Sequence, residues 1–120
     1  MLTPASRLQL EPLSTIELHA LLTLAQAGST AYSLALSIAV DTQDQFRPTV
    51  NGVTSTLKRM MARGWVEVRT VGRTRQYHLA DRGRQQLSFE LDRLSEVVAV
   101  GRSRLTPERD IWYSNDMMGL

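Results

Sequence analysis

The chain has 120 residues, 42% of them hydrophobic and 22% charged, which predicts one globular domain rather than a disordered polymer. It has no cysteine, which excludes disulfides and thiolate metal sites, and no apolar run approaches the ~20 residues of a membrane span. Residues 1–12 lack a basic stretch followed by an apolar core, so we expect no signal peptide, no membrane partner and a cytoplasmic location. A small binding protein is favoured over an enzyme.

The positive charge is concentrated in the middle of the sequence, although the net charge is only +2. Between Arg47 and Arg84 there are nine cations and two acids, so the rest of the chain carries a net charge of −5. Thirteen of the fourteen cations in the whole chain are arginines, whose forked guanidinium suits phosphates and guanine edges. This asymmetry indicates a polyanionic partner, and an ordinary solvated, arginine-rich surface is the alternative.

The N-terminal third predicts an arm followed by two helices. Residues 1–12 contain two prolines and no periodicity, which is typical of an arm. Ser14 and Glu17 match a capping box at the start of a helix predicted over Thr15–Ala27. A second helix is predicted to begin near residue 30 and to end before Asp41, because apolar residues recur there at helical spacing.

A third helix and a hairpin follow. Thr49 is the predicted N-cap of a helix that Gly64 ends, with an apolar stripe on one side. The period of the pattern then changes from 3.6 to 2 residues, which predicts strands over Trp65–Val71 and Thr74–Leu79 joined by a short turn. These three helices and the hairpin give a winged helix-turn-helix domain over residues 13–80, mainly α with a small β-hairpin (α+β).

The last predicted element is a long helix over residues 81–105, ending near Arg104, and residues 106–120 are a tail. The spacing of its apolar residues resembles a coiled-coil seam, which predicts a partner helix from a second copy of the chain. The candidate dimerisation residues are Leu87, Leu91, Leu94 and Val98.

The second helical element of a helix-turn-helix enters the DNA major groove, and its first residues reach base edges. Projection at 100° per residue places a polar face opposite the apolar stripe of the third helix. We therefore predict base contacts from Asn51, Thr54 and Ser55, of which Asn51 suits adenine. The predicted phosphate contacts are Thr49, Lys58 and Arg59 on this helix and Arg73 and Arg75 at the hairpin tip. For each of them, a merely solvated side chain is the alternative.

Between about Leu13 and Leu105 the chain resembles the PadR family of bacterial winged-helix transcription regulators. The matching segments are 13–18, 31–34, 56–60, 64–67, 75–79 and 81–84. Asn51–Thr54 stands where the family usually reads Gly-Thr-Leu-Tyr, so the customary tyrosine is absent. The resemblance implies a homodimer in which the C-terminal helix packs partly on the partner's N-terminal helix. It also implies a possible pocket for a flat aromatic effector, which Trp112 and Tyr113 would line; the alternative is that these two residues clamp the tail onto the partner or are disordered.

Other chemistry is not indicated. The two histidines, His19 and His78, are far apart in sequence and lack neighbouring ligands, so we expect no metal and no cofactor. Tyr32 and Tyr77 are predicted to lie in the core. The favoured function is a dimeric, sequence-specific DNA-binding regulator, a repressor that occludes a promoter. The alternatives are a winged-helix protein-interaction adaptor and a small-molecule-responsive sensor with an effector pocket at the dimer interface.

Overall fold

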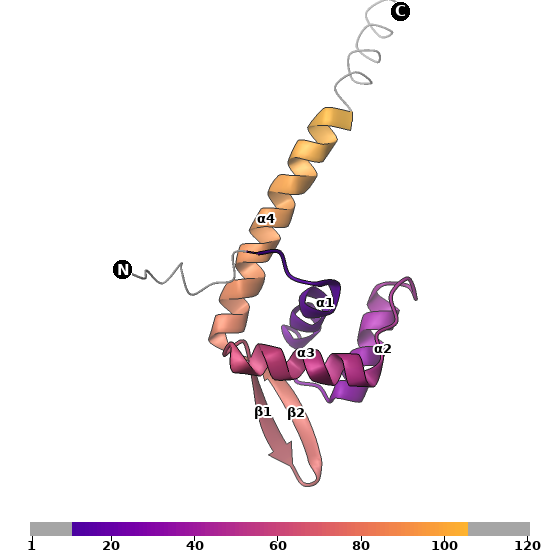
Figure 1. Cartoon of the computed structure of the whole chain (residues 1–120), viewed down its shortest axis with the longest axis vertical. Coiled ribbons are helices and arrows are strands. Elements are labelled where there is room, and N and C mark those ends of the chain that lie inside the picture. Colours follow the sequence, from indigo (N-terminus) through magenta and orange to yellow (C-terminus); the bar gives the residue numbers. More distant parts are fainter. Residues whose placement is uncertain (1–10, 106–120) are drawn as a thin grey trace, which may run out of the picture. The chain divides into compact units, whose positions relative to one another are not determined.

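The computed structural model describes residues 11–105 of the chain, and Figure 1 shows the order of its elements. The helices and strands are α1 (Thr15–Leu24), α2 (Ala31–Asp41), α3 (Val50–Ala62), β1 (Val66–Val71), β2 (Thr74–Leu79) and α4 (Asp81–Leu105). This is the α+β arrangement with a long last helix that the sequence predicts. The described residues form two compact units, of which unit 1 ends at Ser88 and unit 2 begins at Phe89.

The helices of unit 1 begin where their capping residues predict. The Ser14 hydroxyl accepts a hydrogen bond from the Glu17 N–H, and the Glu17 carboxylate accepts one from the Ser14 N–H, at 3.2 and 2.9 Å. Thr30 caps α2, and the Thr49 hydroxyl accepts from the third residue of α3. The predicted end of α1 is wrong by three residues, because the chain already turns at Ala25. Conversely, α2 runs one residue further than predicted, to Asp41.

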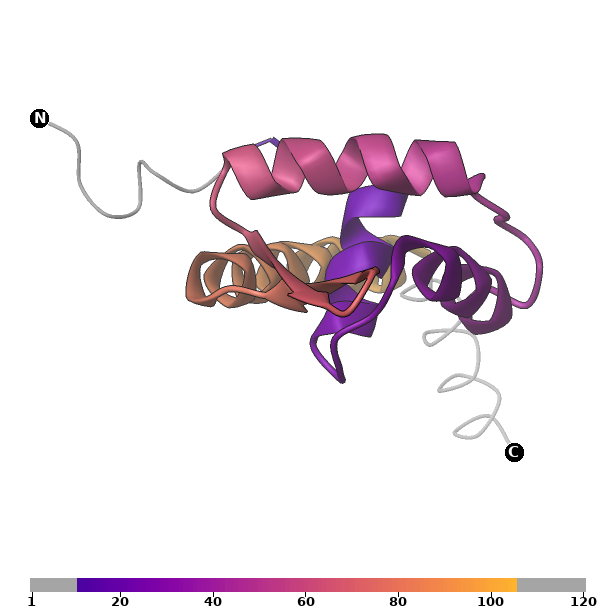
Figure 2. The same ribbon diagram turned by 90° about the horizontal axis from the view of Figure 1, so that it is seen from below.

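The core of unit 1 lies between the three helices and the hairpin. Figures 1 and 2 show α3 along one side of the unit, and both α1 and α2 contact it. The apolar side chains of the described residues that are fully buried are Ala20, Leu21, Leu34, Ile38, Val53, Leu57 and Met60. Tyr77 is buried as predicted, whereas the prediction for Tyr32 is wrong, since its side chain is 63% exposed. Tyr32 lies with Leu36 and Val40 on the outer face of α2, opposite the stripe that packs inward.

The hairpin is a regular antiparallel pair. Its register places Val66 opposite Leu79 and Val71 opposite Thr74, so that Gly72 and Arg73 form a two-residue turn. Gly72 has a φ of +62° while Arg73 is not in the positive-φ region, as in a type II′ turn. This turn matches the twist of the strands and places Arg73 at the tip.

A third segment pairs with the hairpin. Ser29 and Tyr77 form a bridge with two backbone hydrogen bonds, of 3.0 Å from the Ser29 N–H and 2.8 Å from the Tyr77 N–H. The bridge attaches the connection between α1 and α2 to the wing strand β2. The sequence does not predict it, because one bridging residue has no periodicity.

Unit 2 contains the described residues from Phe89 to Leu105, which continue α4. Arg93 forms a bidentate interaction with Glu90, with N···O distances of 2.9 and 2.8 Å. The hydrogen bonds that Arg93 donates to the Glu90 carboxylate raise the pKa of Arg93. Within residues 11–105 no helix is long and apolar enough to cross a membrane. The same residues contain no group of three or more histidines and acids placed to hold a metal ion.

Candidate nucleic-acid interface

The outward face of α3 is the centre of the candidate site. Val53, Leu57 and Met60 are fully buried, so the opposite side of the helix is directed to solvent. Asn51 and Ser55 lie exposed in the first two turns of this face, as the sequence predicts. They are four positions apart, so Ser55 lies about one helical turn, or about 5.4 Å, further along α3 than Asn51.

The hydroxyl groups of Thr49, Thr54 and Thr56 all form hydrogen bonds to the backbone of α3. The Thr49 hydroxyl accepts a hydrogen bond of 2.9 Å from the Gly52 N–H and caps α3. The Thr54 hydroxyl donates a bond of 2.9 Å to the Val50 carbonyl oxygen, and the buried Thr56 hydroxyl donates one of the same length to Gly52. Thr54 is one of the predicted base contacts, and this bond engages its hydroxyl hydrogen within α3.

Four exposed cations extend the site along α3 and the wing. Lys58, Arg73 and Arg75 have no carboxylate within ion-pair distance among the described residues. Arg59 donates a hydrogen bond of 3.2 Å to the Thr56 hydroxyl and is likewise without an acidic partner in the described part of the chain. Charges of this kind raise the positive potential of the surface and are available to phosphate groups.

Three other cations of the basic segment lie within ion-pair distance of carboxylates. Arg63 pairs with the buried carboxylate of Glu17 at 3.3 Å and lies over the Trp65 ring, 5.0 Å from its centroid. Arg69 lies 4.0 Å from Glu67, and Arg47 pairs with Asp44. The charge count of the sequence does not separate these paired arginines from the unpaired ones.

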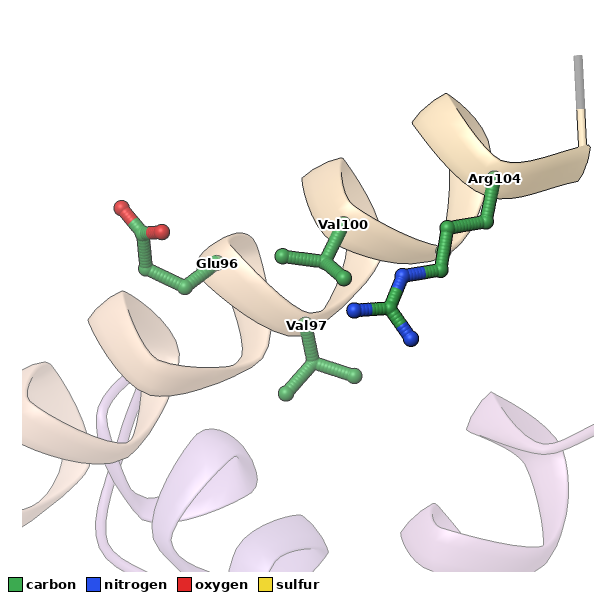
Figure 3. Close-up of a pocket in the computed structure, with 5 residues that line it drawn as sticks. Glu96, Val97, Val100 and Arg104 are labelled. Atoms are coloured by element: carbon green, nitrogen blue, oxygen red, sulfur yellow. The ribbon is translucent and has the colours of Figure 1, made fainter. Parts of the chain in front are cut away.

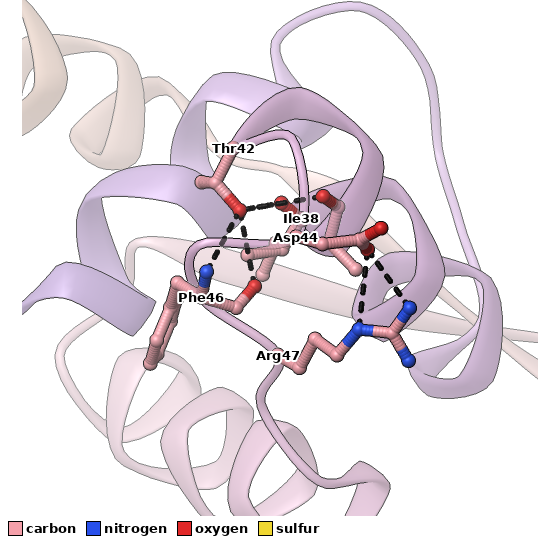
Figure 4. Close-up of polar contacts among 6 residues, drawn as sticks. Ile38, Thr42, Asp44, Phe46 and Arg47 are labelled. Atoms are coloured by element: carbon pink, nitrogen blue, oxygen red, sulfur yellow. Dashed lines mark hydrogen bonds and ion pairs between the residues drawn. The ribbon is translucent and has the colours of Figure 1, made fainter.

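The connection between α2 and α3 is held by hydrogen bonds around Thr42, as Figure 4 shows. The Thr42 hydroxyl donates to the Ile38 carbonyl at 2.8 Å and accepts from the Phe46 N–H at 3.2 Å. Gln43 and Asp44 have φ values of 52° and 63°, in the left-handed region that non-glycine residues rarely adopt. The tight turn sets the angle at which α3 leaves α2. Sequence reasoning missed it, because neither residue is a glycine.

The candidate dimerisation seam divides between the two units. Leu87 is buried in the core of unit 1, whereas Leu91 and Val98 on unit 2 are 43% and 52% exposed. Beside this seam on unit 2 there is an open, mainly apolar pocket of about 400 Å³. Val97 and Val100 line it, and Figure 3 shows their side chains on α4. Glu96, Gly101 and Arg104 complete the lining.

The predicted effector-lining residues Trp112 and Tyr113 lie outside the described residues, as do the tail and most of the predicted arm.

Neither the models of known protein families nor the sequences of characterised proteins match this chain. Solved structures match its fold. A PadR family transcription regulator from Clostridium difficile R20291 superposes with a TM-score of 0.67 at 16% identity, over 77% of this chain and 99% of that one. A transcriptional regulator from Clostridium thermocellum gives a TM-score of 0.66 at 14% identity, over 73% and 87%.

Bacillus subtilis PadR, solved in complex with operator DNA, superposes with a TM-score of 0.61 at 19% identity. The match covers 68% of this chain and 48% of PadR, so this chain spans about half of that protein. At these identities the likeness establishes the fold, which is that of winged-helix regulators. The predicted fold class is confirmed, and PadR-family regulators are among the structural neighbours, as the sequence resemblance predicts.

Proposed function

We propose that this chain is a dimeric, sequence-specific DNA-binding regulator of transcription that represses by occluding a promoter. The observation that carries the proposal is the placement, on both α3 and the wing tip of a winged-helix fold, of cations that have no carboxylate partner among residues 11–105. A neighbour with this fold was solved with operator DNA. A protein-interaction adaptor needs only one of these two elements to be charged, so positive charge on both α3 and the wing favours DNA as the partner.

In this proposal α3 enters the major groove and its first two turns read bases. Asn51 supplies an amide that donates and accepts, which matches the N6 and N7 edge of adenine. Ser55, one turn further on, reaches the next base or its phosphate. Asn51 is thus the residue on which sequence preference depends most.

Lys58 and Arg59 lie further along the helix, where the groove wall brings phosphates close. Arg73 and Arg75 at the wing tip contact the neighbouring backbone or enter the minor groove. These contacts add affinity without sequence information, and they release counterions on binding.

Dimerisation follows from the exposed apolar side chains of unit 2. Leu91 and Val98 are exposed and Leu94 between them is half-buried; the three recur at coiled-coil spacing, and a second copy of the helix would bury them further. Two recognition helices related by a twofold axis would then occupy major grooves about 34 Å apart, one helical turn of DNA. A complex of this size on a promoter excludes the transcription machinery.

A small-molecule-responsive sensor is the second candidate, and the pocket on unit 2 favours it. Its volume of about 400 Å³ lies within the range of ligand sites, which is ~300–1,000 Å³. Flat aromatic compounds that stabilise the wild-type protein against heat, and that fail to stabilise a Val100→Asp variant, would support it. Equal stabilisation of both proteins would exclude this pocket.

The test of the proposed function is a salt-dependent binding titration on the DNA upstream of the chain's own gene, because such regulators often control themselves. Random DNA of equal length is the competitor. We expect a discrete complex that outcompetes random DNA and weakens steeply with salt. The Arg73→Ala/Arg75→Ala variant should weaken binding to all DNA and reduce the slope of log K against log salt by roughly 2.

Two further variants separate the roles. Asn51→Ala should remove the preference for the specific fragment while leaving binding to random DNA almost unchanged. Arg69→Ala is the matched control on the wing, since Arg69 is near Glu67, and it should change the salt slope much less. Binding that is absent at moderate salt, or equal for any DNA, would overturn sequence-specific regulation at this site.

A further inference from the structure

Val50, the first residue of α3, is an apolar side chain on the edge of the candidate interface. It is 40% exposed, whereas Val53 and Leu57 of the same helix are fully buried. At 100° per residue Val50 lies between this buried stripe and the outward polar face. Its exposed part therefore borders Asn51 on the surface that the proposed function places in the major groove.

Thr54 lies one turn after Val50 on the same side of α3. Because its hydroxyl donates to the Val50 carbonyl at 2.9 Å, that hydrogen is not available to a base edge. The side chain is half-buried, so that its methyl group is the part that remains for an apolar contact. Val50 and Thr54 together form a short apolar column next to the column of Asn51 and Ser55.

We propose that the side chain of Val50 and the methyl group of Thr54 recognise the 5-methyl groups of thymines. The inference rests on the proposed function and names the class of DNA that it selects: sites with neighbouring A·T pairs, in which Asn51 reads adenine. In the major groove, the thymine methyl is the one apolar feature of a base edge, and small aliphatic groups are its usual contacts. A G·C pair has no methyl group in the major groove and presents mainly hydrogen-bonding atoms there, which the column cannot satisfy.

The two predicted threonine contacts thereby acquire different roles. Thr49 is a capping residue whose hydroxyl lies 2.9 Å from the Gly52 nitrogen, so its contribution to DNA binding is the position of the α3 N-terminus. Thr54 contributes a methyl group rather than a hydrogen bond.

The experiment begins with selection of bound duplexes from a random library, which requires no knowledge of the operator. The selected pool and the unselected library are then each remade with deoxyuridine in place of thymidine, which removes only the 5-methyl groups. We expect the selected pool to bind about fourfold or more weakly after this exchange, the effect of at least one lost buried methyl contact. The unselected library should bind equally well with either base.

Two variants of Thr54, each of which lacks one of its two γ groups, provide the matched pair. Thr54→Ser keeps the hydroxyl that bonds to the Val50 carbonyl but lacks the methyl, so it should distinguish thymine from uracil less than the wild type does, with Val50 as the remaining contact. Thr54→Val keeps a methyl and lacks the hydroxyl, so it should retain the distinction. Thermal unfolding of each variant verifies that the fold is intact.

The outcomes separate this inference from the function on which it rests. If no sequence is enriched, the proposed function and the inference both fail. If sequences are enriched but bind equally with thymine and uracil, only the thymine contact is overturned. The same conclusion follows if Thr54→Ser discriminates as well as the wild type.

Discussion

Gly83 lies in the first turn of α4, directly against the carbonyl group of Trp65. That carbonyl also accepts a hydrogen bond of 2.9 Å from the Ala80 N–H, so backbone meets backbone at this point. A Cβ atom at position 83 would overlap the Trp65 carbonyl. The close approach fixes the start of α4 against the start of β1 within unit 1.

We expect Gly83→Ala to lower the free energy of unfolding by about 1–3 kcal/mol, the usual cost of overpacking. Gly101→Ala is the matched control in the same helix, because an added Cβ there meets no atom of the described chain. It should raise stability by up to about 1 kcal/mol through helix propensity. Urea denaturation measures both variants, and a Gly83→Ala protein as stable as the wild type would contradict the close approach.

Glu17 is a buried carboxylate that serves two elements at once. It completes the capping box of α1, and it pairs with Arg63 just after α3. We expect Glu17→Ala to cost about 1–2 kcal/mol, because it removes a cap and an ion-pair partner. Glu17→Gln preserves an oxygen that accepts from the Ser14 N–H and should cost less. Thermal unfolding of the pair measures the difference, and equal losses would show that the cap contributes nothing.

At the scale of elements, the connection between α2 and α3 is tight and strained. Gln43 adopts a φ of 52° without the freedom of glycine, at a typical cost of about 1–2 kcal/mol. The surrounding bonds of Thr42 maintain this conformation. Backbone strain of this kind is typical of functional regions. Here the strained turn sets the direction of α3, the helix at the centre of the candidate interface.

Gln43→Gly should therefore raise the free energy of unfolding by about 1 kcal/mol. Gln45→Gly is the matched control in the same connection, since Gln45 is not in the positive-φ region, and it should lower stability. Equilibrium unfolding of the two variants tests the assignment. A stability loss of similar size in both would contradict it.

At the scale of the whole molecule, the exposed residues of unit 2 decide the oligomeric state in our proposal. Leu91→Asp should yield monomers in analytical ultracentrifugation without loss of the fold, because Leu91 is 43% exposed. Asp92→Ala, an adjacent exposed residue outside the seam, should leave the dimer unchanged. A dimer that survives Leu91→Asp would remove the seam from the proposal. Leu87→Asp should instead destabilise unit 1, because Leu87 belongs to its core.

The sequence by itself determined the helices, the hairpin and their caps. Capping boxes, apolar periods and two-residue turns depend on residues within a few positions of each other, so local physics is enough to predict them. Ser14, Thr49 and Gly72 all have the roles that their local patterns predict. The exposed face of α3 follows from the same argument, because burial of the apolar stripe leaves the opposite side of the helix in solvent.

Only the tertiary structure decided which groups of the site remain available. Arg63 is paired because Glu17, 46 residues earlier, is folded against it, and no local pattern carries that information. Tyr32 is exposed because other residues of α2 fill the core. The Thr54 hydroxyl is committed to its own helix, a choice between two rotamers that the sequence leaves open. Long-range packing and side-chain rotamers thus determine the chemistry of a surface whose position the sequence predicts.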